Sequence, residues 1–451
     1  MPADSAVSSD AARPDAPEPT GFSRSFVVLV VAQIISLLGD RIICFALPLY
    51  VLNLTGSASL YSVVTASALI PYIVLTPIGG VVADRVTRQR LMACLDVVLA
   101  LICGAFLLLE GVANLVALCV CAMVGLYAVQ AFYAPTVQAS VPSLVGRASL
   151  VRATAITNQV SSLAALIGPF AGGMLYGFFG LEPILVVGAA AFLCSCALVS
   201  LFVRTPRVVR EGVGQAPVGE PGGPADMQDA PLRRGPLAIA AADLRDAGRF
   251  LRANPPLVKT IALSAALNLV LSAFVTVGLP VIVTQMLGLP NQLMGVAEAL
   301  VGVGGLLGGM LVAVLGSRLR LRHASWGVVA AAALFAPIAA TLWLLPGAMA
   351  TYAVVVGCLA LVMVGCQVFT IQCVSYVQLT TPDALIGKVI SLCVAACMCA
   401  TPAGQLVWGV LFDAFCGQVA VLALVVAGLS LALAAAVRAT FGHLPDPSAR
   451  C

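Results

Sequence analysis

The sequence has 451 residues, of which 61% are hydrophobic and only 9% are charged, and its net charge at neutral pH is +4. Soluble domains contain about 25% charged residues, so a soluble protein of this size would lack the charged groups that cover its surface. The composition therefore excludes an ordinary soluble enzyme and predicts an integral membrane protein.

The chain begins with a polar segment rich in proline, alanine and aspartate, residues 1–25. This segment lacks the basic start and the short apolar stretch of a cleavable signal peptide, and we expect it to form a disordered cytoplasmic tail. The first apolar run, Phe26 to Leu52, is too long for a signal sequence. It is therefore expected to be the first membrane-spanning helix.

A membrane-spanning helix needs about 20 apolar residues, and twelve segments of this sequence meet that condition. They are residues 26–52, 58–82, 91–109, 113–134, 153–179, 183–203, 257–284, 293–316, 324–345, 349–376, 386–412 and 417–437. The sequence thus predicts an all-α integral membrane protein with twelve transmembrane helices. We expect two pseudo-symmetric six-helix bundles, at residues 26–204 and 257–438.

The basic residues follow these segments in a regular way. All 23 Lys and Arg residues except Arg41 lie in the terminal tails, or within or beside the even-numbered connections. The odd-numbered connections contain none. Because basic residues in short loops stay on the cytoplasmic side, both termini are expected in the cytoplasm. The protein is then a multi-pass component of the cell inner (cytoplasmic) membrane.

A long connection, residues 205–256, joins the two halves. Its central part is rich in glycine and proline and is expected to be disordered. Near 241–252, apolar and basic residues fall on different faces of a helix, which is typical of a short amphipathic helix on the membrane surface. A solvated linker helix is the alternative. Residues 439–451 are expected to form a second cytoplasmic tail.

The two halves contain similar stretches at corresponding places. "GGVVADRVTRQR" (79–90) closes the second segment, and "GGMLVAVLGSRLRLR" (308–322) closes the eighth. "VPSLVGRASL" (141–150) and "TPDALIGKVISL" (381–392) lead into the fifth and the eleventh. Duplicated bundles can rock about a site at the middle of the membrane. The repeat therefore indicates a transporter that works by alternating access.

Three motifs in this sequence resemble the major facilitator superfamily. The connection after the second segment resembles that family's signature, with Gly80, Asp84, Arg85, Arg88 and Arg90. The fifth segment resembles the motif of its antiporter branches, with Gly168, Pro169, Gly172 and Gly173. "SLLGDRIICFALPLYVLNLTGSAS" (36–59) and "FYAPTVQASVPSLV" (132–145) resemble exporters of the macrolide-efflux and siderophore-export type.

The resemblance implies a role for the charged connection that comes after the second segment. In the family, the glycine lets the second helix approach the eleventh, and the acidic residue, here Asp84, lies near the start of that eleventh helix. The positive end of the helix dipole favours a carboxylate there, so this connection would act as a latch that closes the cytoplasmic side. The alternative is that Arg85, Arg88 and Arg90 only fix the topology and contact lipid phosphates.

The resemblance also implies a substrate cavity lined by the first, fourth, seventh and tenth helices. Polar residues on three of these helices are candidates for its lining: Gln130, Tyr133, Gln138, Asn268, Gln367, Thr370 and Gln378. A mostly apolar lining with a few amides suits a bulky amphipathic ligand better than a sugar. Hydrogen bonding between helices is the alternative role for each of them.

Charged residues inside the spans are costly and are functional candidates by default. Asp40 and Arg41 are adjacent, so they point about 100° apart on a helix, and we expect one to face the cavity and the other a neighbouring helix. A long arginine could reach Glu298 in the eighth segment, and Asp96 is a rival partner. Asp40 or Glu298 would carry a coupling proton, because a carboxyl group removed from water binds a proton more readily. A structural ion pair, or an Arg41 side chain that reaches the membrane surface, is the alternative.

Two features of the spans indicate packing rather than chemistry. The glycines of "GVGGLLGG" (302–309) lack the preceding strand of a dinucleotide-binding loop, and we expect them to pack against Gly168, Pro169 and Gly172. The 15 cysteines lie almost entirely in apolar runs and the chain has only two histidines. We therefore predict no metal site and no cofactor.

Taken with the resemblance, the sequence predicts a proton-driven exporter of amphipathic drug-like compounds such as macrolides. A siderophore or metabolite exporter and an uptake permease are alternatives. A membrane-embedded enzyme is a further alternative, but the sequence has neither an HExxH nor a GxSxG motif. We expect a monomer that binds a small molecule, protons and the lipid bilayer, and no nucleic acid.

Overall fold

The computed structural model describes residues 22–146, 149–203, 245, 247–315, 324–344, 347–415 and 417–441. Within this part of the chain all regular structure is helical, and twelve helices are long and apolar enough to cross a membrane. The prediction of an all-α protein with twelve membrane spans is confirmed. The chain is a multi-pass membrane protein.

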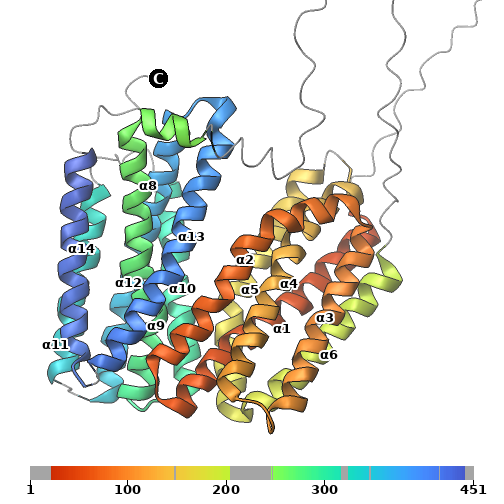
Figure 1. The fold of residues 1–451 in the computed structure, drawn as a ribbon, viewed down its shortest axis with the longest axis horizontal. Coiled ribbons are helices and arrows are strands. Elements are labelled where there is room, and N and C mark those ends of the chain that lie inside the picture. Colours follow the sequence, from red (N-terminus) through yellow and green to blue (C-terminus); the bar gives the residue numbers. More distant parts are fainter. Residues whose placement is uncertain are drawn as a thin grey trace, which may run out of the picture.

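The first half contains six helices joined by short connections (Figure 1). They are α1 (Arg24–Thr55), α2 (Ala58–Arg85), α3 (Arg88–Leu109), α4 (Leu115–Leu144), α5 (Leu150–Phe179) and α6 (Leu181–Phe202). The turn between α1 and α2 shows how the sequence ends one helix and starts the next. Gly56 adopts a left-handed conformation with φ of 65°, and the Ser57 hydroxyl accepts a hydrogen bond from the Leu60 amide.

The second half repeats this arrangement with one difference in its first span. That span, Pro255–Met286, consists of α8 (Pro255–Leu267), a π-helical segment η2 (Asn268–Ser272), α9 (Ala273–Pro280) and a second π-helical segment η3 (Val281–Met286). The other helices are α10 (Asn291–Leu315), α11 (Ala324–Leu344), α12 (Ala348–Thr380), α13 (Asp383–Ala414) and α14 (Val419–Phe441). Before α8, residues 247–253 are also helical, and Ala247 and Leu251 are buried.

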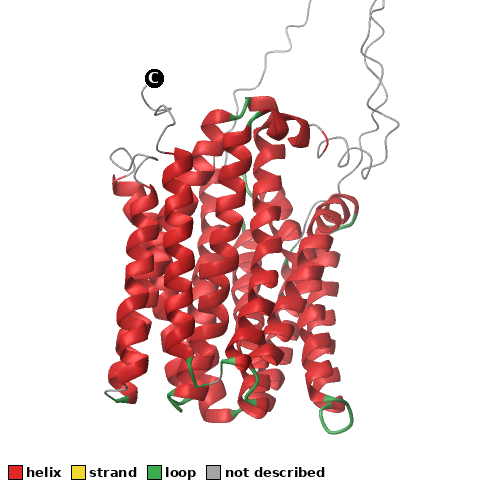
Figure 2. Cartoon of the chain, turned by 60° about the vertical axis from the view of Figure 1, so that its left-hand side comes forward, coloured by secondary structure: helices red, strands yellow, loops and turns green. Residues whose placement is uncertain are grey.

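The helices form two bundles, which diverge at one end and meet at the other (Figure 1). Figure 2 shows the helices from another side, running roughly along one another and joined by loops at their ends. The main contacts between the bundles are made by α2 with α13 and by α5 with α10. These are spans two and eleven, and spans five and eight. Span two corresponds to span eight, and span five corresponds to span eleven. The contact between spans two and eleven is therefore the symmetry mate of the contact between spans eight and five, as the internal repeat predicts.

Glycines allow the closest approaches between helices, but their partners differ from those predicted. A Cβ atom on Gly304 would lie 2.8 Å from the Ala360 carbonyl carbon, and one on Gly308 would lie 2.7 Å from the Val364 carbonyl oxygen. Both neighbours are on α12. The prediction that the glycines of 302–309 pack closely is thus right. For Gly304 and Gly308 the predicted partner is wrong, since positions four residues apart share a helix face and this face is turned toward α12. Gly302 lies on another face, against Leu166 of α5.

The α5 motif packs elsewhere. Gly168 faces Arg41 and Gly172 faces Phe45, both on α1, while Gly173 lies against Gly295 near the start of α10. Helix α10 therefore contacts α5 through the face that contains Gly295, and it contacts α12 through the face that contains Gly304. The antiporter-type motif holds α5 between α1 of its own bundle and α10 of the other.

A buried carboxylate joins three helices of the first bundle. Asp96 on α3 is fully buried and accepts hydrogen bonds from the Ser36 hydroxyl of α1 at 2.8 Å and from the Ser195 hydroxyl of α6 at 2.7 Å. Each carboxylate oxygen has a donor. Asp96 is therefore not the ion-pair partner of Arg41 that the sequence left open.

The close contact of α10 with α12 makes a prediction about two adjacent glycines. Gly304→Val should place a branched side chain against the backbone of α12 and destabilise the fold by about 1–3 kcal/mol, which lowers the melting temperature in detergent by several degrees. Gly305→Val is the matched control, because a Cβ atom there would meet nothing within 4 Å. Equal melting temperatures for the two variants would contradict this packing.

The Asp96 junction makes a second prediction. Asp96→Leu should leave the Ser36 hydroxyl without its acceptor and leave the Ser195 hydroxyl only the Ala32 carbonyl oxygen, at a cost of about 1–3 kcal/mol. Asp96→Asn keeps an acceptor oxygen and the same shape, so its loss should be smaller. Thermal unfolding of the purified variants measures both, and an Asp96→Leu variant as stable as the wild type would refute the junction.

Candidate functional site

The two bundles are joined at the face of the membrane opposite the start of α1. Asn53 at the end of α1 donates a hydrogen bond to the Asn291 side chain at the start of α10, at 2.9 Å. Gln285 donates to the carbonyl oxygen of Leu52 at 3.2 Å. All these residues border odd-numbered connections, and we call this end the opposite face. The face with the even-numbered connections is called the basic face.

A carboxylate of α13 reaches the start of α2 at the same end. Asp413 accepts hydrogen bonds from the backbone amides of Ala58 at 2.7 Å and Ser59 at 3.0 Å. It also accepts from the Ser57 hydroxyl at 2.7 Å and from the Ser59 hydroxyl. One turn before Asp413, Gly409 lies against Ser62. This set of contacts closes the opposite face between the first and second halves.

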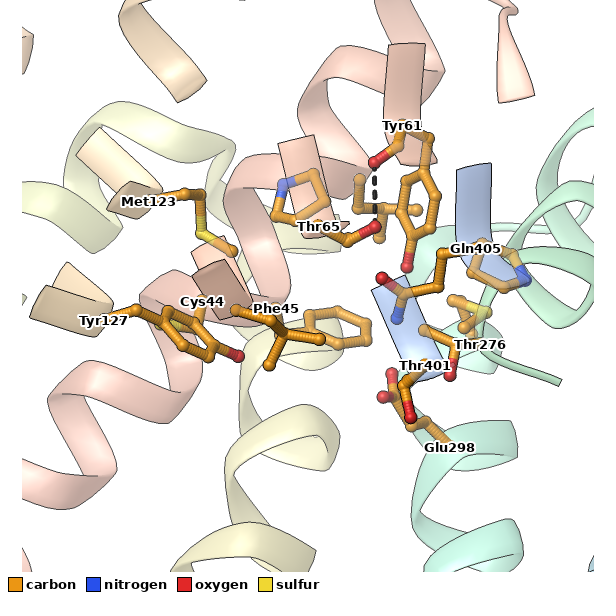
Figure 3. A pocket seen from close by; sticks show the side chains of 15 residues that line it. Cys44, Phe45, Tyr61, Thr65, Met123, Tyr127, Thr276, Glu298, Thr401 and Gln405 are labelled. Atoms are coloured by element: carbon orange, nitrogen blue, oxygen red, sulfur yellow. Dashed lines mark hydrogen bonds between the residues drawn. The ribbon is translucent and has the colours of Figure 1, made fainter. Parts of the chain in front are cut away.

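A central cavity of about 270 Å³ lies between the bundles. Helices of both halves supply its lining, and Figure 3 shows the side chains at close range. The lining consists of Cys44, Phe45, Pro48, Leu49, Tyr61, Thr65, Leu69, Met123, Tyr127, Thr276, Pro280, Met294, Glu298, Thr401 and Gln405.

Glu298 is the one charged residue in that lining. It projects from α10 toward the side chains of Thr401 and Thr276 (Figure 3). Among the described residues it has no hydrogen-bond or ion-pair partner within the distances that define these contacts. A carboxylate without a partner in an apolar surrounding is costly, so Glu298 is available to a cation or a proton.

Aromatic and sulfur-containing side chains lie across the cavity from Glu298. Tyr127 and Met123 come from α4, and Phe45 comes from α1 (Figure 3). Tyr61 of α2 lies near Gln405 at the edge of the same space. Aromatic faces attract organic cations, and thioethers adapt to ligands of different shape. The cavity therefore combines one negative charge with a deformable apolar wall.

The seventh span is irregular where it meets the cavity. Thr276 and Pro280 belong to α9, which lies between the two π-helical segments. Such segments are frequent at functional sites because they re-aim side chains and free backbone groups. The carbonyl oxygen of Leu269, in η2, accepts a hydrogen bond from the Trp408 indole of α13 at 3.2 Å.

Asp40 and Arg41 occupy different surroundings, and neither residue lines the central cavity. Asp40 is buried, with 1% of its side chain exposed, and accepts a hydrogen bond from the Cys44 thiol at 3.7 Å. The Gln130 side chain of α4 lies beside its carboxyl group. Arg41 is 38% exposed and its stem packs on Gly168 of α5. Arg41 is therefore the more exposed residue of the pair.

The arginine pairs with its neighbour and not with α10. Nε of Arg41 lies 4.0 Å from Oδ2 of Asp40, within the range of an ion pair. The arginine side chain is long enough to fold back across the angle that separates adjacent positions. The bridge from Arg41 to Glu298 that the sequence allowed is not formed.

Three predicted cavity residues come together in a smaller pocket inside the first bundle. Gln130, Tyr133 and Gln138 line a space of about 50 Å³ between α1, α4 and α5. Gln33 lies on the other side of this space and donates to the Ser161 hydroxyl at 3.5 Å. The Gln130 amide nitrogen and the Tyr133 hydroxyl are buried without a hydrogen-bond partner. A water molecule fits a pocket of this size and polarity.

The remaining candidates do not line the central cavity. Asn268 donates to the Ser264 carbonyl at 3.0 Å, and Thr370 donates to the Cys366 carbonyl at 2.9 Å, so both bond to their own helix. Gln367 and Gln378 are exposed on α12, and Gln367 lies beside Gly308. The second, eighth and eleventh spans line the cavity in place of the tenth.

Several polar residues of the cavity were not among the predicted ones. Tyr61 and Thr65 are four residues apart on α2, and Thr401 and Gln405 are four residues apart on α13. Polar pairs at this spacing within an apolar span mark one face of a helix. That signal is present in the sequence at both places.

The signature connection lies at the basic face, away from the closed end. Gly80 and Asp84 are in the last turns of α2, and a Cβ atom on Gly80 would meet nothing within 4 Å. Arg85 and Arg90 are exposed and Arg88 is half-buried. The Asp84 side chain lies outside what the structure describes. The latch between Asp84 and the start of α13 stays a prediction for a state in which the basic face is closed.

Several known proteins are similar to this chain, among them two efflux proteins and one solved transporter structure. Macrolide efflux protein A of Streptococcus pyogenes is 24% identical over 184 residues, which cover 41% of this chain and 45% of that protein. The multidrug efflux pump Tap of Mycolicibacterium fortuitum is 28% identical over 181 residues, 39% of this chain and 44% of that protein. The matched region thus spans about half the length of these curated relatives.

The third is a bacterial homologue of the iron transporter ferroportin, a solved structure that shares the fold at 18% identity. Its inward-facing state has a TM-score of 0.67 and covers 93% of this chain and 98% of its own. Its outward-facing state, with the same coverage, has a TM-score of 0.52. The family model described as Major Facilitator Superfamily matches residues 29–392. Twelve spans, two bundles with exchanged contacts and this match together show that the chain belongs to the Major Facilitator Superfamily.

Proposed function

We propose that this protein is a secondary active transporter that exports amphipathic, positively charged drug-like compounds in exchange for protons. The observation that supports this most directly is the unpartnered Glu298 carboxylate in a cavity between the two bundles. A cation and a proton neutralise the same carboxylate, so the two would bind in turn and not together.

The contacts between the bundles support alternating access. The hydrogen bonds that join the halves lie at the opposite face, while Gly80 and Gly387 near the basic ends of α2 and α13 have open space around them. Basic residues mark the cytoplasmic side. On this interpretation the structure is open to the cytoplasm, and the higher TM-score with an inward-facing neighbour supports it.

The lining of the cavity supports a cationic amphipathic substrate. Glu298 would bind an amine or other organic cation, with Tyr61, Tyr127 and Phe45 around its apolar part. A volume of about 270 Å³ is just below the usual range of ligand sites, about 300–1,000 Å³. It therefore suits the charged part of a larger molecule such as an aminosugar-bearing macrolide, and the macrolide and multidrug efflux relatives agree with this class.

Between the two candidate proton carriers, the geometry favours Glu298. The charge of Asp40 is offset by Arg41 at 4.0 Å, and Asp40 is closed off from the central cavity. The charge of Glu298 is offset by no described residue. Asp40 and Arg41 would instead set the position of α1 against α5, through the Arg41 stem on Gly168.

The alternatives receive less support. Acidic siderophores would be repelled by Glu298, which is the one charge in the cavity lining. An uptake permease would use the same cavity, and the direction of transport separates it from an exporter. We propose a monomer in the cytoplasmic membrane, since the cavity is completed by the two halves of one chain.

Export is tested by measuring the accumulation of a panel of fluorescent or radiolabelled macrolides and lipophilic cations in cells with and without the protein. We expect accumulation severalfold lower in cells that contain the protein, and we expect a protonophore to abolish the difference. Higher accumulation in the presence of the protein would favour uptake. A difference that survives the protonophore would refute proton coupling.

The role of Glu298 is tested by Glu298→Gln, which keeps the size of the side chain and removes its charge. We expect uphill export of a lipophilic cation to fall at least about tenfold, the effect of losing one charge interaction worth about 1.4 kcal/mol or more. Glu182→Gln, an exposed carboxylate at the start of α6, is the matched control and should export normally. Normal export by both Glu298→Gln and Asp40→Asn would show that neither carboxylate carries the coupling proton.

A further inference from the structure

The helices α2 and α13 run in opposite directions along each other. The start of α2, at Ala58, lies beside the end of α13, at the opposite face. The end of α2, at Arg85, and the start of α13, at Asp383, both border even-numbered connections and so belong to the basic face. Each face therefore has one helix start and one helix end from this pair.

A carboxylate sits near the end of each of the two helices. Asp413 is in the last turn of α13 and accepts hydrogen bonds from the start of α2. Asp84 is in the last turn of α2, at the face where α13 starts. From this arrangement we propose that Asp413 is a positioning residue for the transport cycle. It caps α2 while the opposite face is closed, and in the other state the Asp84 latch on α13 that the family resemblance implies takes its place.

The contacts of Asp413 satisfy groups that a helix start leaves free. The first four backbone amides of a helix have no partner within it. Ser57 serves the amide of Leu60, and Asp413 serves those of Ala58 and Ser59. Hydrogen bonds from amides to a carboxylate are stronger than those between neutral groups, and the helix dipole adds to them. The start of α2 is therefore capped by a residue that lies more than 350 positions later in the chain.

The cap is built to be released. Asp413 is exposed to solvent even in this closed state, so water can replace α2 as its partner when the bundles separate at this end. Exposed charge interactions contribute little net free energy. This contact can thus bias the choice between two states without locking either of them, which a gate requires.

The same two helices line the central cavity. Tyr61 lies one turn beyond the capped start of α2, and Gln405 lies two turns before Asp413 on α13. A ligand that draws these side chains together therefore acts on the helices whose ends are capped. This inference rests on the alternating access of the proposed function, but it concerns the gate and not the substrate or the proton.

The test is amide hydrogen exchange on the purified full-length protein, read by mass spectrometry without any substrate. We expect Asp413→Ala, which removes the acceptor oxygens, to speed exchange in the peptide that covers residues 57–62 at least about fivefold, the effect of losing one helix cap. We also expect slower exchange in peptides 80–90 and 383–392, because the population should move to the state in which the basic face is closed. Glu182→Gln, which removes a carboxylate at the same face, should change neither region.

Two outcomes would overturn the proposal. The first is unchanged exchange at 57–62 in Asp413→Ala. The second is faster exchange at both ends, which would indicate general destabilisation and no alternation. If Asp413→Ala does not fold, Ser59→Ala removes one hydroxyl donor and keeps the carboxylate, and it should give the same pattern of exchange with smaller changes. Because this readout needs no transport, a failure of the export assays would leave it standing, and its own failure would leave the export assays unaffected.

Discussion

The cost of placing a carboxylate among membrane-spanning helices governs this structure. Asp96 has two serine hydroxyl donors from neighbouring helices, and Asp40 has Arg41. Asp413 has the start of another helix. Glu298 alone faces a cavity without a described partner. Asp96 and Asp413 hold different helices together, Asp40 is paired with its neighbour on α1, and Glu298 is left for a ligand.

This division also separates the rigid parts of the molecule from the parts that must move. Asp96 and the ion pair of Asp40 lie within the first bundle, so they persist when the bundles rock. Asp413 joins the two bundles and has to be released in each cycle. The glycine contacts follow the same division, because Gly304 packs α10 within its own bundle while Gly173 meets Gly295 of the other bundle. Small residues at both places let backbones approach, which is how membrane helices gain packing energy.

Much of the fold could be predicted from the sequence, because length and apolarity decide where helices cross a membrane. The positions of the twelve spans followed from hydropathy, and the division into two similar halves followed from the internal repeat. The partner of the α10 glycines could not be predicted, since a helix packed on several sides has more than one face rich in small residues. Gly304 and Gly302 are two positions apart and face different helices.

The cavity was harder to predict than the fold. The family resemblance pointed to the tenth span, whereas the second, eighth and eleventh spans line the central cavity. Which residues surround a site between two moving bundles depends on the state of the molecule, and hydropathy contains no information on that state. Glu298 was identified because it is charged. Whether Arg41 pairs with Glu298 or with Asp40 depends on the conformation of one long side chain, which the sequence does not determine.

The central claim is that Glu298 binds a substrate cation and a proton in turn. The most direct measurement is the proton release that accompanies binding of tetraphenylphosphonium, a lipophilic cation with no proton of its own, to the purified protein in weakly buffered detergent solution. We expect release that approaches one proton per bound cation in the wild type at a pH where Glu298 is protonated, and none in Glu298→Gln. Binding without proton release in the wild type, or equal release by the variant, would contradict the claim.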